Sequence, residues 1–157
     1  MNIKLVVVGK TAEKYLQDGI DVYVQRLKHY VNFELTVIPA LKEQKGVAPD
    51  EVKQREAALI LKQIEKYDRV VLLDEHGTQH GSVDFAQYIQ KQMNAGVRNL
   101  AFVVGGAFGF APSVYAAAND KLSLSKMTFN HQMVRLFFVE QLYRAFTILH
   151  HEPYHNE

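Results

Sequence analysis

The residues that could hold a ligand lie in three loops in the second half of the chain, each following a predicted strand. They are residues 72–77, 103–106 and 122–129. They combine apolar side chains with glycines and carry few charges, so backbone amides and carbonyls are available to a ligand. If the three strands are neighbours in a parallel sheet, the loops converge on one crevice, where open α/β sheets bind ligands. Such a crevice suits an adenine-containing ligand better than a triphosphate.

Three matches to known motifs fail on chemical grounds. Residues 9–11 resemble the end of a P-loop, but Lys4 stands where that motif needs its first glycine. Residues 151–155 fit a zinc-peptidase pattern, but Pro153 breaks the helical turn that must place both histidines on one face. The glycines of 105–109 follow the fourth strand and lack dinucleotide-binding spacing. We therefore expect no metal site and no dinucleotide fingerprint.

Apolar runs and helical periodicities alternate along the chain. Strands are expected at 3–8, 33–38, 69–73, 100–104 and, briefly, 122–124. Helices are expected at 16–31, about 49–67, 82–96, 112–119 and about 132–149. Residues 41–48 and 74–81 are predicted loops, with Ser82 as an N-cap. This alternation predicts an α/β fold, a mostly parallel sheet with helices on both faces.

Length and composition limit the class of protein. The 157 residues fit a single domain, 1–157. Eighteen lysines and arginines against 17 acidic residues give a net charge of +1, so any contact with nucleic acid must be local. No apolar run reaches the roughly 20 residues of a membrane helix, and residues 1–4 lead straight into a strand without a signal peptide. With no cysteine, the chain fits a cytoplasmic protein.

The last predicted helix, 132–149, carries apolar residues on nearly every side. A helix of this kind is buried all round, and a small domain rarely buries a terminal helix completely. We therefore expect its outer face to pack against a second copy of the chain in a symmetric homodimer. A central core helix is the alternative.

Several short segments occur in an order that points to a family. They are Leu73-Asp74 with Gly77, Val104-Gly105-Gly106 with Gly109, Leu122-Ser123-Leu124-Ser125, Met127-Thr128-Phe129, His131-Gln132-Met133-Val134-Arg135, Glu140-Gln141-Leu142-Tyr143-Arg144-Ala145 and Tyr154-His155. In these segments the chain resembles the RlmH family (ribosomal RNA large subunit methyltransferase H) of the SPOUT methyltransferase superfamily, over essentially its whole length.

The resemblance implies an S-adenosyl-L-methionine-dependent enzyme that methylates N3 of a pseudouridine in 23S rRNA of the assembled ribosome. It also implies a homodimer and a C-terminal trefoil knot, which general topology rules would not have suggested. The cofactor contacts it implies are Leu73, Gly105, Leu124, Ser125, Lys126, Met127, Thr128 and Phe129. The chain departs from the family pattern at Asn130, where proline is common, and at Asn156-Glu157, where a basic residue is usual.

The N3 imide of pseudouridine is a weak acid and must lose its proton before or during methyl transfer. Candidate bases or orienting groups are Tyr154, His155 and His131, and the tail pair is favoured because an exposed terminus has no obvious packing role. Arg135 and Arg144 lie nine residues apart, on opposite sides of the last helix. One of the two could contact an RNA phosphate or the negative charge that develops during the reaction, and Arg135 is the candidate for this catalytic role. The other could pair within the dimer, with Glu140 as one partner.

Two other functions remain open. One is a non-catalytic module of the same fold that binds S-adenosylmethionine or RNA without turnover, which Asn130 and the altered tail would fit. The other is a superfamily enzyme that acts on tRNA, disfavoured because such relatives tend to carry extra basic surface or domains. Lys126 is either a phosphate contact or a solvated lysine.

Overall fold

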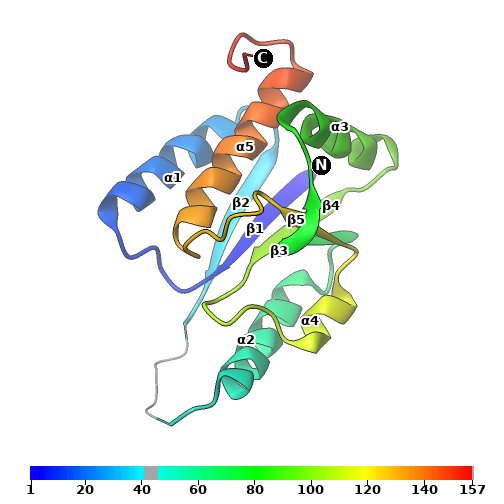
Figure 1. Ribbon diagram of the computed structural model, residues 1–157. Helices are drawn as coiled ribbons and strands as arrows, with labels where there is room; N and C mark the ends of the chain where they lie inside the picture. The colour runs from blue at the N-terminus through cyan, green and yellow to red at the C-terminus, as the bar shows by residue number, and fades with distance from the viewer. Residues whose placement is uncertain (41–45, 157) are drawn as a thin grey trace.

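The computed structural model describes residues 1–40 and 46–156. Strands and helices alternate along it (Figure 1) as β1 (Asn2–Val8), α1 (Lys14–Leu27), β2 (Asn32–Ile38), α2 (Pro49–Ile64), β3 (Arg69–Gln79), α3 (Ser82–Asn94), β4 (Asn99–Val104), α4 (Pro112–Ala117), β5 (Asp120–Ser123) and α5 (Met133–Leu149). The predicted α/β alternation is confirmed. Within these described ranges, no helix is long and apolar enough to cross a membrane.

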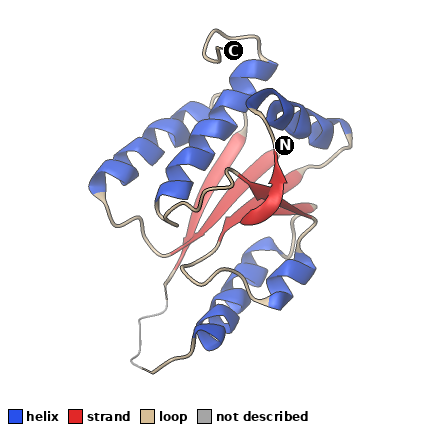
Figure 2. Ribbon diagram, in the orientation of Figure 1, coloured by secondary structure: helices blue, strands red, loops and turns tan. Residues whose placement is uncertain are grey.

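The strands form one parallel sheet in the order β2-β1-β4-β3-β5. Helices cover both of its faces, as Figure 2 shows. On one face, α5 packs between α1 and α3, and on the other α2 packs beside α4. Since β4, β3 and β5 are neighbours, the three loops that follow them lie at one edge of the sheet, as predicted.

Each face of the sheet has its own hydrophobic core. Under α1, α3 and α5 the largest buried rings are Phe102 and Phe138, whose centroids lie 4.7 Å apart. Under α2 and α4 the core is mostly aliphatic, with Ile60 and Leu72 among its members and Phe110 as a buried ring. The three inner strands, β1, β4 and β3, contribute residues to both cores, which explains the apolar runs in their sequences.

Several boundaries differ from the predictions, among them β5, which spans Asp120–Ser123 and not 122–124. β3 continues through Gln79, so the loop predicted at 74–81 is wrong over most of its length. Ser82 is the first residue of α3 and Gly81 is the N-cap, without a side-chain cap. Helices α1 and α2 end at Leu27 and Ile64, earlier than expected, because turns follow them. Of the loop predicted at 41–48, residues 41–45 lie outside the described ranges.

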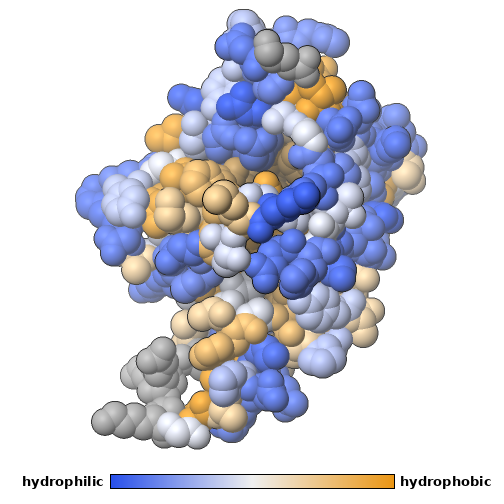
Figure 3. All heavy atoms as spheres, viewed as in Figure 1, coloured by the Kyte–Doolittle hydropathy of each residue, from blue (hydrophilic) through white to orange (hydrophobic). Residues whose placement is uncertain are grey.

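The α5 helix is not buried all round within one chain. Its sheet side is buried, with Phe138 and Leu142 fully enclosed. On its outer side Phe137 is 39% exposed and Met133 is 38% exposed. Figure 3 shows apolar side chains gathered over this part of α5 and its border with α1. This surface is available for contact with another molecule.

Candidate active site

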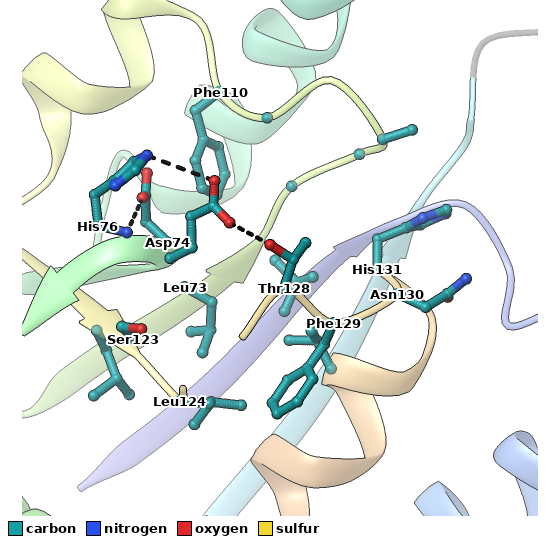
Figure 4. Close-up of a pocket in the computed structure, with 18 of the residues that line it drawn as sticks. Leu73, Asp74, His76, Phe110, Ser123, Leu124, Thr128, Phe129, Asn130 and His131 are labelled. Atoms are coloured by element: carbon teal, nitrogen blue, oxygen red, sulfur yellow. Dashed lines mark hydrogen bonds and ion pairs between the residues drawn. The ribbon is translucent and has the colours of Figure 1, made fainter. Parts of the chain in front are cut away.

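The carboxyl ends of β3, β4 and β5, with the loop that leads into α5, enclose a cavity of about 660 Å³. This volume is typical of sites that bind a small organic molecule. The walls are apolar and come from all three strand ends and the loop (Figure 4): Leu73, Val104, Leu122, Leu124 and Phe129. The three segments predicted to converge do meet at this cavity, although residues 72–77 belong to β3 and do not form a loop.

The glycine loop 105–109 needs its glycines for three separate reasons. A side chain at Gly105 would meet the ring of Phe110 at 3.1 Å. At Gly106 it would meet the carboxylate of Glu56, with Oε1 at 2.7 Å. Gly109 has φ +81°, a conformation that other residues rarely adopt. The loop is closed by a hydrogen bond of 3.1 Å from Gly109 N to Gly106 O.

One rim of the cavity is charged, although its walls are apolar as expected. Asp74, on the extension of β3, accepts hydrogen bonds from the Tyr115 hydroxyl and from His76 N. Burial opposes ionisation of Asp74, but these hydrogen bonds lower its pKa overall. Next to it, Glu75 accepts a hydrogen bond of 2.8 Å from Thr128 Oγ1 and lies 3.5 Å from His76 Nε2. The β3 extension is thereby tied to the facing loop across the cavity (Figure 4).

Short-range hydrogen bonds fix the shape of loop 124–132. Ser125 accepts at its carbonyl from Ser123 Oγ (2.8 Å) and at its hydroxyl from Met127 N (3.0 Å). Asn130 Oδ1 accepts from Gln132 N (2.8 Å), so the asparagine organises the entry to α5 where the family commonly has proline. The loop is therefore held by side-chain contacts that a proline could not make.

The structure brings most of the predicted cofactor residues to the cavity. Its lining includes Leu73, Gly105, Leu124, Ser125, Met127, Thr128 and Phe129. Lys126 is exposed and lies outside the lining. Met127 is 77% exposed, so it forms the lip of the cavity and not an inner wall.

Of the three candidate bases, His131 lines the cavity and the other two do not. Burial, together with the nearby positive charge of Arg135, lowers the pKa of His131. The lowered pKa favours the neutral form of the imidazole, which is the form that can accept a proton.

Arg135 is buried in the first turn of α5 and does not line the cavity. It is 1% exposed and donates to Val8 O at 2.6 Å and Gly9 O at 2.7 Å. A third hydrogen bond, of 3.1 Å, goes to Thr11 Oγ1. A guanidinium enclosed in this way fastens α5 to the end of β1 and presents no surface to RNA in this structure.

The prediction that the Tyr154-His155 tail has no packing role is wrong. The Tyr154 hydroxyl donates to Glu140 Oε1 at 2.8 Å and lies 3.2 Å from the hydroxyl of Tyr23. Arg144 pairs with Glu140 at 2.6 Å and lies 3.1 Å from His155 Nδ1, so the predicted Arg144–Glu140 pair exists, within one chain. Burial and these hydrogen bonds raise the pKa of Tyr154, which makes it a hydrogen-bond donor and not a base.

The tail and the cavity lie at opposite ends of α5 (Figure 1). The helix has 17 residues, which at the α-helical rise gives a length of roughly 25 Å. A single chain therefore places His131 at the cavity and the cluster of Tyr154, His155, Glu140 and Arg144 far from it.

Two side chains of α2 that the sequence analysis overlooked lie at the site. Lys53 lines the cavity, and the carboxylate of Glu56 lies behind Gly106. The position of Glu56 in the sequence could have revealed its burial, because it shares the buried face of α2 with Ala57 and Ile60. A charged residue within an apolar helical stripe is the pattern that would have singled it out. Among the described residues, no group of three or more potential metal ligands occurs.

Comparisons with a family model and with individual relatives point to the same family. A family model described as "Predicted SPOUT methyltransferase" matches residues 1–155. Ribosomal RNA large subunit methyltransferase H of Christiangramia forsetii is 55% identical over 156 residues, which is 99% of each chain. The protein of the same name from Phocaeicola vulgatus is 52% identical over 157 residues and 100% of both chains.

Solved structures share the fold at low sequence identity. A "Probable Methyltransferase" from Bordetella pertussis Tohama I superposes with a TM-score of 0.55 at 10% identity, over 92% of this chain and 95% of that one. TrmJ from Z. mobilis ZM4 gives a TM-score of 0.50 at 11% identity, over 92% of this chain and 69% of that one. At such identities the likeness concerns the fold alone.

Proposed function

The chain belongs to the SPOUT methyltransferase family, and from this we propose that it methylates N3 of a pseudouridine in 23S rRNA, with S-adenosyl-L-methionine as methyl donor. The observation that carries the proposal is the end-to-end match, at 55% and 52% identity, to proteins named Ribosomal RNA large subunit methyltransferase H. The substrate we propose is the assembled ribosome, which places the enzyme in the cytoplasm. We also propose the C-terminal trefoil knot that the resemblance implies.

The cavity fits S-adenosylmethionine in size and chemistry. The leucines and Phe129 offer apolar surface for an adenine ring, and the loops at 105–109 and 124–129 offer backbone hydrogen-bonding groups. The donor supplies a methyl group on a sulfonium, which needs no metal to be transferred. The protein then has to align the methyl group with the attacking nitrogen and exclude water.

Removal of the N3 proton needs a base beside the nucleophile. Within one chain His131 is placed for this task, because it lines the cavity with a lowered pKa. Tyr154 and His155 can take part only if a second chain brings them to the cavity. In that role Tyr154 would exchange its hydrogen bond to Glu140 for one donated to the target base, and Arg135 would act indirectly, by holding α5 in place.

We propose a homodimer through the outer face of α5 and the adjoining face of α1. Exposed apolar residues mark this surface: Tyr15, Val22, Met133 and Phe137. Phe137 also packs on Phe129 of the cavity wall, with ring centroids 5.1 Å apart. A second copy that covers Phe137 would therefore border the cavity, and an antiparallel two-fold contact would bring its tail close to it.

The test is methyl transfer from tritiated S-adenosylmethionine to ribosomes that lack the modification, with protein-free 23S rRNA and tRNA in parallel. We expect label in 23S rRNA of whole ribosomes, at N3 of one pseudouridine after digestion. Label in tRNA would support the tRNA-directed alternative. Binding of the donor without label in any RNA would support the non-catalytic module.

A further inference from the structure

Glu56 is a buried acidic residue on the side of α2 that packs against the glycine loop 105–109. The residue is 8% exposed, on the same face of the helix as Ala57 and Ile60. Within the described ranges no protein donor or cation pairs with either carboxylate oxygen, and these oxygens keep a little contact with solvent, since Arg135 Nε alone is a fully buried side-chain atom without a partner there. Lys53, one turn earlier, pairs instead with Asp50 at 3.4 Å. The carboxylate is therefore not the counter-charge of its nearest helical lysine.

The carboxylate occupies the space that a side chain at position 106 would need. A Cβ on Gly106 would lie 2.7 Å from Glu56 Oε1 and 2.8 Å from Oε2. Unlike Gly109, Gly106 does not have a positive φ, so its backbone conformation does not require glycine. Gly106 also lines the cavity. The missing side chain thus lets a buried carboxylate approach the backbone of the cofactor loop.

A carboxylate that is largely buried and has no protein donor is costly, and burial raises the pKa of Glu56. Such a group gains most from a state of the protein in which donors reach it. The segment closest to the carboxylate is the glycine loop 105–109, and the hydrogen-bond donors of that loop are its backbone amides. The same loop provides the predicted cofactor contact at Gly105, so its shape and the ligand are directly linked.

We propose that Glu56 is a positioning residue for the cofactor site: with the cofactor bound, its carboxylate accepts hydrogen bonds from amides of the glycine loop and holds that loop against the ligand. The inference rests on the proposed function. It assigns to Glu56 a role in binding affinity, not in the methyl-transfer step, since the side chain lies behind the loop and does not line the cavity.

The first test is E56Q, with E65Q as the matched control at the exposed end of the same helix. We expect E56Q to bind S-adenosylmethionine about tenfold more weakly by calorimetry, because hydrogen bonds to a charged acceptor are lost. The rate constant at saturating cofactor should stay within about twofold, so the change appears in KM. The melting temperature without cofactor should be unchanged or higher, because a buried amide costs less than an unpaired carboxylate. E65Q should match the wild type.

Unchanged affinity in E56Q would overturn the inference, and so would a parallel fall in affinity and melting temperature, which indicates a merely structural role. A wild-type protein that does not bind S-adenosylmethionine would instead contradict the proposed function itself. The two failures are thus told apart by the wild-type titration.

The second test is a double-mutant cycle between G106A and E56A. In the wild-type background G106A should lower the melting temperature, because the new methyl group collides with the carboxylate. In the E56A background the same change should cost little stability, while cofactor binding stays weak. An equal loss of stability in both backgrounds would show that Gly106 serves something other than Glu56, and would refute the inference.

Discussion

At Gly77, β3 passes so close to β5 that no side chain fits between them. A Cβ there would lie 2.6 Å from Lys121 C and 2.7 Å from Leu122 N, both backbone atoms that cannot move aside singly. This contact sits where the pairing of β3 with β5 shifts register, between Leu73 and Thr78. The charged rim of the cavity, Asp74 to His76, lies within that irregular stretch.

We predict that G77A destabilises the protein by about 3 kcal/mol or more, because overpacking against backbone forces the two strands apart. G81A is the matched control, since its added methyl group would meet Asp84 Oδ2 at 3.7 Å, an ordinary contact. Urea unfolding of both variants measures the difference. Equal stabilities for G77A and G81A would contradict the close approach of the strands.

The Asp74–Tyr115 hydrogen bond should make the stability depend on pH in acid. The folded pKa of Asp74 is below its ordinary value of 3.8, so its contribution is present above that pH and is lost as the pH falls through the folded pKa. We expect Y115F and D74N each to reduce stability at neutral pH and to approach the wild type below about pH 4. Urea unfolding between neutral and acid pH checks this. A constant deficit at every pH would argue against the bond.

Among the elements, α5 depends on Arg135, which joins its first turn to the end of β1. We predict that R135M lowers the free energy of unfolding by about 3 kcal/mol, because the carbonyls of Val8 and Gly9 lose their donors in the interior. R135K keeps the positive charge but lacks the planar guanidinium group, so its free energy of unfolding should lie between those of the wild type and R135M. R98M replaces an exposed arginine and should leave the free energy of unfolding unchanged.

Activity per folded molecule separates the two roles of Arg135. If it only positions α5, R135K should keep most of the wild-type rate once the folded fraction is accounted for. A large loss of rate in a fully folded R135K would support the catalytic role that the sequence analysis assigned to it.

The elements also show where sequence reasoning succeeds. The buried parts of the strands carried strong signals, because β1 and β4 are apolar along almost their whole length. The extension of β3 carried a weak signal, because β4 ends opposite Leu73 and the pairing with β5 resumes only at Thr78 and Gln79. Asp74, Glu75 and His76 are therefore polar strand residues, without the apolar alternation that identifies a strand.

The residues of the site also fall into those that the sequence could place and those that it could not. Residues next to one another in sequence, such as the loop at 124–129, were placed at the cavity both from the strand pattern and from the resemblance. Contacts between distant segments were missed: Tyr154 with Tyr23 is 131 residues apart, and Glu56 behind Gly106 joins α2 to the loop after β4. No local pattern encodes such pairs, because they arise only when the sheet has assembled.

At the scale of the whole molecule, the separation of cavity and tail predicts complementation between two inactive variants. One carries Y154F with H155A in the tail, and the other carries L124E in the cavity wall. In a mixed dimer one site combines an intact cavity with an intact partner tail. Random exchange makes half the dimers mixed, each with one working site, so mixing equal amounts should restore about a quarter of the wild-type activity.

The measurement is methyl transfer to ribosomes after the two variants have been mixed and allowed to exchange subunits. Each variant alone should be folded by circular dichroism and nearly inactive. F137E should be monomeric in sedimentation, because it places a charge in the proposed interface, and should lose activity with the dimer. Activity of the tail variant at the wild-type level, or of a monomeric F137E, would show that one chain suffices.

The strand order has a consequence for how the chain is made. The first strand, β1, finds its inner neighbour only in β4, where Asn2 pairs with Asn99, and the cover that α1 and α3 give to the face above them is completed only by α5. During translation the early segments can form β1 with β2 and α1, but the central strand is still missing. The protein thus completes its tertiary structure only when almost all of it has been synthesised, and a prematurely terminated product would expose apolar strand surface to chaperones and proteases.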